Sequence, residues 1–486
     1  MQIKQKSLKK NAILNLIKSI MGIIFPLITF PYSSRILLPE GIGKVNFANS
    51  IVSYFAMIAA LGINTYATRE AAKLRDNKIE LTKFFKEVFL INLISTFIAY
   101  LLFFAAVFFI PKFSEYRVLL CVCSVSIIMN TMGIGWLFTA EEEFGYITAR
   151  SIVFQFISLG LLFAFVKTKD DFIWYASINV ISSAGSNICN LFYSRKFINW
   201  KQKTKYNLLH HIKPIMIFFG MSIVSSVYTM LDTSMLGFLS SNVEVGYYTA
   251  ATKLNKIVLV ALVAIIGVLL PRLSYYAEKK DFSQLKDLFN KAFNCIIVLS
   301  IPAAVGLFLL SKDLTLLLSG KEYLPAVPSM RIINPILIFI SLSNLIGIQL
   351  FTPIGKEKIT LFSVIIGAVI NLVFNSIFIP LYGAKGAAIG TVIAEFSVTL
   401  VQLIIARHYI FIKNQLKNLV QSLIASFIMA VLLVFVLKLN LLSLYKVIIS
   451  IFSGVCIYGL ILWLLHNEVF FYMLLFLKSK VRKEKR

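Results

Sequence analysis

Charged residues are scarce in this sequence, and acidic residues are the scarcer kind. Only 14% of the 486 residues are charged, whereas 58% are hydrophobic, and the mean hydropathy is +0.83. This composition excludes an ordinary soluble domain, because too little of the chain is polar to cover a folded core. We therefore expect an all-α integral membrane protein.

Cysteine and histidine are also few, with five and four residues. The cysteines are odd in number and all fall in apolar stretches, which supports neither a disulfide framework nor a zinc site. The histidines lack the spacing of metal ligands. We expect no metal, no catalytic residue and no cofactor, with a proton or sodium ion as the one coupling ion to consider.

Long polar loops are missing too. The loops reach at most roughly 25 residues, which is too short for a separate domain. A polymerase or glycosyltransferase acting on lipid-linked sugars would be expected to have an acidic catalytic loop or a long external loop. The one acidic cluster, Glu141 to Glu143, stands beside Arg150 and fits a solvated helix start better. An enzyme is therefore the weakest functional hypothesis.

The sequence does contain a series of long apolar segments. A membrane-spanning helix needs roughly 20 mainly apolar residues, and about fourteen segments meet that requirement. They are expected at residues 11–33, 42–63, 87–110, 116–137, 148–166, 172–193, 214–238, 246–270, 289–311, 325–351, 359–380, 386–406, 418–437 and 443–465.

Basic residues outnumber acidic ones, 48 to 22, and they cluster in alternate loops. Of the 48, 22 lie in residues 64–86, 194–213, 272–288 and 478–486, which the positive-inside rule places in the cytoplasm together with both termini. The net charge of +26 then reflects topology and contact with anionic membrane lipids. A nucleic-acid partner is not expected, because no basic domain exists outside the spans.

Two stretches share one layout, GKVNFANSIVS from Gly43 and GYYTAATKLNK from Gly246. Their polar residues fall on one face of a helix at equivalent positions: Asn46, Asn49, Ser50 and Ser53 in the first copy, and Thr249, Thr252, Lys253 and Lys256 in the second. Transporters are often built from such repeats, with the substrate between them. The alternative is a chance recurrence of small residues.

The basic stretch 194–214 separates six expected spans from six more, with two extra at the end. We therefore expect an N-terminal six-helix lobe at 1–197 and a cytoplasmic linker at 198–213. A second six-helix lobe is expected at 214–410. Two further helices and a basic tail would occupy 411–486.

Five blocks along the chain carry a family signature. They are FPYSSRILLPEGIGKVNFANSIVSYFAMIAALGINTYATREAA at 30–72; Trp136 with Glu142, Tyr146 and Arg150; VGYYTAATKL at 245–254; SLSNLIGIQLFTPIGKEK at 341–358; and GAKGAAIGTVIAE at 383–395. Together they resemble the Wzx-type oligosaccharide flippases, which share a superfamily with the MATE antiporters and the lipid II flippases.

The resemblance implies two pseudo-symmetric lobes in a V-shaped, MATE-like arrangement that alternates access. It implies an undecaprenyl-pyrophosphate-type lipid-linked glycan as substrate, moved from the inner to the outer leaflet of the bacterial cytoplasmic membrane. The product would feed O-antigen or capsule synthesis, with membrane lipids, glycosyltransferases and a polysaccharide polymerase as partners. Lipid II or teichoic-acid precursors are alternative substrates. A MATE-like drug or cation antiporter is less favoured, because cationic drugs need an acidic cavity and the repeated face carries lysines.

Charges inside spans are costly and usually functional. Lys256 is expected about ten residues into its helix, hence roughly 15 Å deep, and is the leading candidate to bind pyrophosphate. Lys253 lies on the same face. Asp232, however, falls at a matching depth on the preceding helix, and a salt bridge explains Lys253 equally well.

Two more basic residues complete the candidate set. Lys18 shares a polar face of the first helix with Asn11, Asn15 and Gly22, although its side chain can snorkel to the membrane surface. Arg331 is suited to bidentate phosphate binding, and an interfacial anchor is its alternative. The predicted substrate-binding set is Lys18, Asn46, Asn49, Ser50, Lys253, Lys256 and Arg331.

Two acids are candidates for ion coupling, Asp232 and Glu395. Glu395 falls in the middle of an expected span, where burial favours the neutral carboxylic acid unless a basic group compensates it. It can therefore bind a coupling proton or cation, as related antiporters use membrane carboxylates. Pairing with a basic residue is the alternative for both acids.

Overall fold

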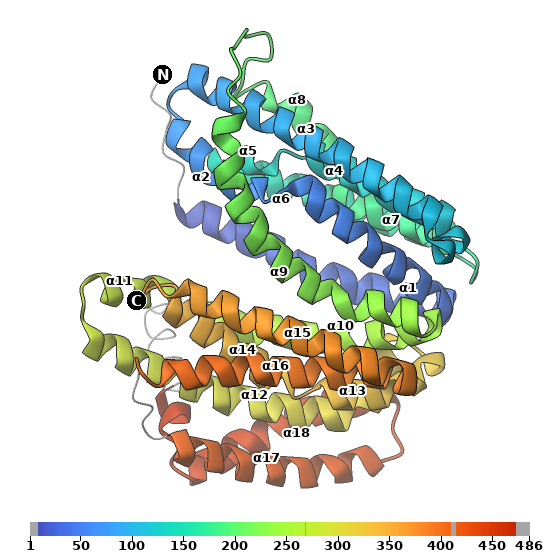
Figure 1. The fold of residues 1–486 in the computed structure, drawn as a ribbon. Helices are drawn as coiled ribbons and strands as arrows, with labels where there is room; N and C mark the ends of the chain where they lie inside the picture. The colour runs from blue at the N-terminus through green and yellow to red at the C-terminus, as the bar shows by residue number, and fades with distance from the viewer. Residues whose placement is uncertain (1–7, 268, 410–414, 473–486) are drawn as a thin grey trace. The chain divides into compact units, whose positions relative to one another are not determined.

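The computed structural model describes residues 8–267, 269–409 and 415–472, which are almost wholly helical (Figure 1). These residues contain no β-strand, so the predicted all-α fold class is confirmed. The basic tail 478–486 and the first seven residues lie outside the described part. The chain divides into two compact units, residues 1–246 and 247–486, and each is described by itself.

Unit 1 begins with α1, α2 and α3, and its last complete helix is the long α9. Its helices are α1 (Leu8–Ala60), α2 (Ile63–Leu74), α3 (Lys78–Phe109), η1 (Pro111–Tyr116), α4 (Arg117–Met132), α5 (Gly135–Ala140), α6 (Phe144–Phe165), α7 (Phe172–Ala184), η2 (Gly185–Asn187), α8 (Ile188–Ser194) and α9 (Leu209–Leu239). The next helix, α10 (Asn242–Gly267), begins in unit 1 and continues in unit 2.

Unit 2 contains the rest of α10 and the C-terminal helices. These are α11 (Leu270–Glu278), α12 (Phe282–Leu318), η3 (Lys321–Ala326), α13 (Val327–Ile333), α14 (Ile336–Asn344), η4 (Leu345–Phe351), α15 (Glu357–Tyr382), α16 (Ala384–Ala406), α17 (Gln415–Lys438) and α18 (Ser443–Leu464). The unit boundary at Gly246 differs from the predicted linker 198–213. The two divisions rest on different criteria, so the lobe boundaries stay a prediction.

Within the described residues, ten helices are long and apolar enough to cross a membrane, or eleven when one bent pair counts as a single span. The bent pair is Lys321–Ile333 with Ile336–Phe351, which meet at an angle of 47°. The expected span 172–193 is divided among α7, η2 and α8. The chain is thus a multi-pass membrane protein, whereas the number fourteen stays a prediction.

The first apolar helical segment is too long for one crossing. Its 58 residues, 17–74, would extend for roughly 87 Å as a straight helix, and the hydrocarbon layer is about 30 Å thick. The backbone breaks at Leu38, where φ is 59° and ψ is 176°. Pro39 follows, and proline disfavours the helical conformation of the residue before it. The expected boundary between spans 11–33 and 42–63 therefore falls at Leu38.

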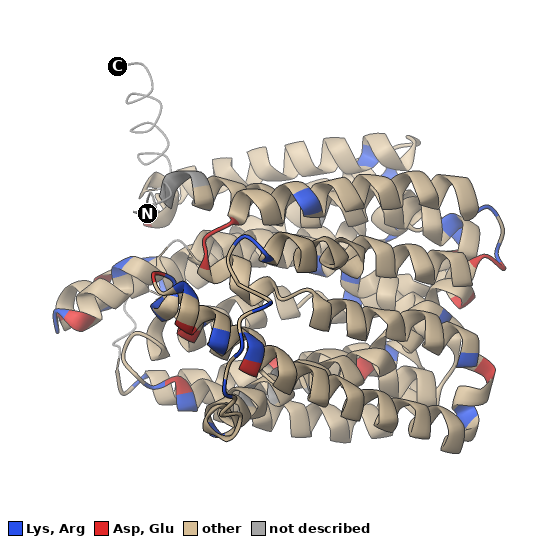
Figure 2. Cartoon of the chain, turned by 90° about the horizontal axis from the view of Figure 1, so that it is seen from above, with Lys and Arg blue, Asp and Glu red and all other residues tan. Residues whose placement is uncertain are grey.

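Each unit has a buried aromatic core. In unit 1 this core joins α2, α3 and α5 around Phe85, Trp136 and Phe138. Elsewhere large apolar side chains are exposed, as in Phe109, which is 77% exposed. Exposed apolar surface on this scale is what a lipid-facing protein requires. Charged residues gather instead at helix ends and in the connecting loops (Figure 2).

The two repeat glycines pack at reciprocal positions within unit 1. A side chain at Gly43 would collide with the backbone carbonyl of Asn242, and one at Gly246 would collide with the carbonyl of Pro39. Asn242 and Pro39 each stand four residues before the glycine of their own copy. The contact is therefore the same in both directions, as expected of a pseudo-twofold repeat. Glycine is needed at both positions because the opposing atoms are backbone.

Candidate functional site

The polar face of the first repeat lies on the second half of α1. Asn46 and Asn49 are half-buried, and Ser50 is only 2% exposed. Asn46 donates its side-chain amide to the carbonyl of Ile42 at 2.7 Å, and Ser50 donates its hydroxyl to that of Phe47 at 2.7 Å. Ser50 is thus satisfied inside the helix bundle, and the half-exposed asparagines are the members of this face that a ligand can reach.

The first half of α1 carries Lys18. Its side chain is exposed, as are those of Ile17 and Ile20 beside it. Asn11, expected on the same polar face, is instead buried at 9% exposure, and its side-chain nitrogen has no hydrogen-bond partner within the described part of the chain. The expected face is therefore divided between the surface and the interior. The side chain of Asn15 lies outside what the structure describes.

The second repeat face lies on α10 in unit 2. One side of this helix is packed, since Ala251 and Leu254 join Met330 in a buried cluster. The other side presents Lys256, which is exposed, while Lys253 is half-buried. Among the described residues, no hydrogen-bond or ion-pair partner is found for the ammonium group of Lys256. A lysine without a carboxylate partner on a membrane helix is free to meet an anionic ligand.

Arg331 on α13 is held by the neighbouring helix α12. Its Nε donates to the hydroxyl of Ser311 at 2.9 Å, and its guanidinium lies 5.4 Å from the ring centroid of Phe308. The side chain is exposed. These contacts orient the guanidinium fork and leave its two terminal nitrogens available for an anion.

The two acids proposed for ion coupling are both buried. Asp232 on α9 and Glu395 on α16 are each 8% exposed. Asp232 belongs to unit 1 and Glu395 to unit 2, so each is considered in its own unit. The expected pairing of Asp232 with Lys253 stays a prediction. A buried carboxylate is a group whose charge depends strongly on its surroundings, which is the property that ion coupling requires.

The structure also reveals a polar cluster that the sequence did not predict. Glu87 on α3, His211 on α9 and Tyr66 on α2 are 4%, 6% and 4% exposed. The Oε2 atom of Glu87 lies 2.9 Å from His211 Nε2, and His211 Nδ1 lies 2.7 Å from the Tyr66 hydroxyl. The other Glu87 oxygen accepts the backbone N–H of Asn207 at 2.8 Å. The cluster thus ties the segment before α9 to α2 and α3.

The signal for this cluster was present but ambiguous. Glu87 stood at the expected end of a span, where a charged residue normally faces water, and His211 stood in a basic loop. In the structure α3 begins nine residues earlier, at Lys78, so Glu87 lies inside the helix. Only the packing of α9 against α2 and α3 shows that the two groups meet.

The acidic cluster and the family-signature residues around it form structural contacts. Glu142 pairs with Arg75 at 2.9 Å, and Glu143 pairs with Lys196 at 3.3 Å. Hydrogen bonding to the Tyr193 hydroxyl and to Glu143 raises the pKa of Lys196 above its ordinary value. Arg150 donates to the carbonyl of Ser186 at 3.0 Å. These interactions connect α5 and α6 to their neighbours within unit 1.

Two family models match the chain. The family described as "Polysaccharide biosynthesis protein" matches residues 8–277, which is more than half of the sequence. The MatE family model matches residues 217–377.

Curated relatives and solved structures extend the match. A protein of Escherichia coli strain K12 named "Putative O-antigen transporter" is 26% identical over 84% of this chain and 99% of its own length. The "Probable low-salt glycan biosynthesis flippase Agl15" of Haloferax volcanii is 26% identical over 49% of this chain and 51% of that protein.

A solved structure described as "Lipid II flippase MurJ, inward closed conformation" has a TM-score of 0.68 at 19% identity. It covers 92% of this chain and 99% of that one. At this identity the likeness establishes a common fold, so the prediction of a helical membrane fold like that of the MATE proteins and lipid II flippases is confirmed.

Proposed function

Because the chain belongs to the polysaccharide biosynthesis protein family, we propose that it is a flippase for lipid-linked oligosaccharides. It moves a polyprenyl-pyrophosphate-linked repeat unit from the inner to the outer leaflet of the bacterial cytoplasmic membrane by alternating access. No covalent bond is made or broken. Glycosyltransferases supply the substrate, and a polysaccharide polymerase uses the product.

The observation that carries this proposal is the exposed Lys256 on α10 of a polysaccharide-family membrane protein, which has no partner among the residues that the structure describes. A pyrophosphate group is anionic and loses its hydration when it crosses a bilayer, so it needs a cationic partner inside the protein. Lys256, Arg331 and Lys18 supply exposed positive charge on membrane helices. Asn46 and Asn49 add polar groups suited to sugar hydroxyls.

The orientation is part of the same proposal. Loop 194–213, the loop around α11 and both termini face the cytoplasm, because these segments are rich in basic residues. Substrate is then loaded from the side on which sugar nucleotides are consumed. Lipid II and teichoic-acid precursors share the pyrophosphate or phosphate linkage and remain alternatives of the same class.

A drug or cation antiporter is the second candidate, and the MatE match over residues 217–377 favours it. Cationic substrates need acidic side chains in the cavity. The exposed Lys256 on α10 argues against a cationic substrate, because it would repel one. The charge of the transported molecule therefore discriminates the two functions.

A reconstituted transport assay tests the proposal. Proteoliposomes are loaded with an undecaprenyl-pyrophosphate-linked N-acetylglucosamine that carries a labelled sugar, and appearance of label in the opposite leaflet is followed with a membrane-impermeant glycosidase. We expect transport by the unmodified protein, a loss of at least about tenfold in Lys256→Ala, and a smaller loss in Lys256→Arg, because one ionic hydrogen bond contributes roughly 1.5–3 kcal/mol.

The matched control is Lys438→Ala, which removes an exposed lysine at the end of α17 and should leave transport unchanged. Full transport by Lys256→Ala at normal abundance would remove Lys256 from the site. Transport of a lipophilic cation together with no movement of the lipid-linked sugar would favour the antiporter.

A further inference from the structure

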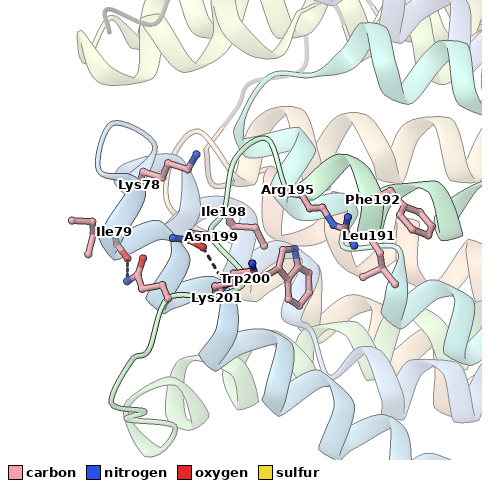
Figure 3. A pocket seen from close by; sticks show the side chains of 10 residues that line it. Lys78, Ile79, Leu191, Phe192, Arg195, Ile198, Asn199, Trp200 and Lys201 are labelled. Atoms are coloured by element: carbon pink, nitrogen blue, oxygen red, sulfur yellow. Dashed lines mark hydrogen bonds between the residues drawn. The ribbon is translucent and has the colours of Figure 1, made fainter.

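A basic groove lies on the surface of unit 1, and none of the predicted substrate-binding residues lines it. It has a volume of about 1020 Å³ and is formed by the start of α3, the end of α8 and the loop that follows α8. Figure 3 shows Arg195 beside Leu191 and Phe192, with Lys78 and Ile79 on the other side of Trp200. The groove is at the upper end of the size range of small-ligand sites, roughly 300–1,000 Å³.

The charge of the groove has one sign. Its lining, all of it within the described residues, contains the three basic side chains of Lys78, Arg195 and Lys201 and no acidic one. All three are exposed, and none is paired with a carboxylate in the part of the chain that the structure describes. The Lys78 ammonium donates to the carbonyl of Lys196 at 3.4 Å. The groove therefore presents uncompensated positive charge to an anion.

The loop that forms the groove is held in place. The side-chain amide of Gln202 donates to the carbonyl of Ile79 at 3.2 Å, and the indole N–H of Trp200 donates to the Ser194 hydroxyl at 3.1 Å. Lys86 from α3 donates to the carbonyls of Trp200 and Gln202 at 2.8 and 2.5 Å. These bonds order the loop before any ligand binds, which reduces the entropic cost of binding.

One edge of the groove is continuous with exposed apolar surface. Phe192 and Ile188, on the last turns before the loop, are 65% and 44% exposed, and Ile79 across the groove is 70% exposed. The guanidinium of Arg195 lies 5.7 Å from the ring centroid of Phe192. Exposed aromatic and apolar residues next to basic ones are typical of the level at which lipid headgroups lie.

We propose that this groove binds the headgroup of an anionic phospholipid of the phosphatidylglycerol class. The phosphodiester contacts Arg195, Lys78 and Lys201, while an acyl chain follows Leu191 and Phe192 into the bilayer. The apolar edge favours a lipid over a soluble anion, because only a lipid uses both surfaces. This site is independent of the transport activity proposed above and would exist whether or not the protein moves oligosaccharides.

Lipid binding to the purified full-length protein tests the site. Native mass spectrometry from detergent measures the apparent affinity for phosphatidylglycerol, with phosphatidylcholine as the zwitterionic comparison and inorganic phosphate as the soluble one. The groove variant combines Lys78→Gln, Arg195→Gln and Lys201→Gln. The matched control combines Lys203→Gln, Lys205→Gln and Lys213→Gln, which removes the same charge from exposed positions of the same region that do not line the groove.

Each basic group near an anionic lipid raises the binding affinity by a factor of about five. The groove variant should therefore lose at least about tenfold in affinity for phosphatidylglycerol, whereas the control should change less than about threefold. A charge-conserving variant, with Lys78→Arg, Arg195→Lys and Lys201→Arg, should retain most of the binding and shows that a loss in the glutamine variant is not a folding defect.

Three results would overturn the inference. Equal losses in the groove variant and the control would mean general attraction to a basic region. Unchanged affinity in the groove variant would place the lipid elsewhere. Displacement of the lipid by millimolar inorganic phosphate, with phosphate binding directly, would make the site a soluble-anion site.

Discussion

The buried cluster of Glu87, His211 and Tyr66 allows a quantitative test of how the segment before α9 is fixed. In Glu87→Ala, two hydrogen bonds to the carboxylate are lost, from His211 at 2.9 Å and from the Asn207 backbone at 2.8 Å. Bonds to a charged group contribute roughly 1.5–3 kcal/mol each. Removing one partner of a buried hydrogen bond also leaves the other unsatisfied, which costs about 1–3 kcal/mol. We expect a loss of about 3–5 kcal/mol in the free energy of unfolding.

His211→Ala should cost a similar amount, because it leaves the Glu87 carboxylate buried with one partner. The double variant should cost less than the sum of the two single variants, because the hydrogen bond between Glu87 and His211 can be lost only once. The expected coupling is roughly 1–3 kcal/mol. The assay is equilibrium unfolding of the purified protein in mixed micelles of a mild detergent and dodecyl sulfate, followed by circular dichroism.

The control for this cycle is Glu80→Ala on the same helix. Glu80 is exposed in the first turn of α3, so its loss should cost less than about 1 kcal/mol, mainly through the helix dipole. A cost of Glu87→Ala no greater than that of Glu80→Ala would contradict a stabilising role of the buried cluster. So would two single costs that add without coupling.

Three further outcomes follow from individual contacts. Gly246→Ala should lower protein abundance strongly, because the new methyl group meets the backbone of Pro39. The control is Gly306→Ala, at a helical glycine with open space around it, which should be neutral or stabilise the protein by up to about 1 kcal/mol. Similar abundance of the two variants would disprove the close contact at Gly246. Glu395→Gln should weaken gradient-driven transport in vesicles more than it weakens binding of the lipid-linked sugar, and an unchanged gradient dependence would assign this residue to structure. Arg331→Gln should lower the affinity for the lipid-linked sugar in a direct binding assay by about tenfold, and an unchanged affinity would leave the residue as an anchor.

The fold was largely predictable because its main signal is local. A long apolar run predicts a membrane helix without knowledge of its neighbours, and α15, α16 and α18 begin and end within two residues of their expected bounds. Helix boundaries were predicted less well in stretches where charged and apolar residues alternate. The start of α3 was placed at Glu87 and lies at Lys78, because the basic residues of its first turns resemble a loop.

The sequence predicted which residue types form the candidate site, but it did not predict which of their side chains are exposed. Lys253 and Ser50 stood at equivalent positions of the two repeat faces, yet Lys253 is half-buried and Ser50 is only 2% exposed. Asn11 and Lys18 were expected to share a face, and only Lys18 reaches the surface. Helical periodicity places residues on a face, but the neighbouring helices decide whether that face is covered.

The sequence alone determined that this is a helical membrane protein, where most of its long apolar segments lie and which family it resembles, and it predicted that two of its helices are repeats. These conclusions depend on quantities that add up along the chain, namely apolar length, basic residues per loop and the order of short motifs. The tertiary structure alone decided which charges are compensated. It paired Glu87 with His211 and Glu142 with Arg75, and it left Lys256 and the three groove cations without a carboxylate partner among the described residues. Compensation depends on groups brought within a few ångströms by helix packing, because Coulomb and hydrogen-bond energies act across space and not along the chain.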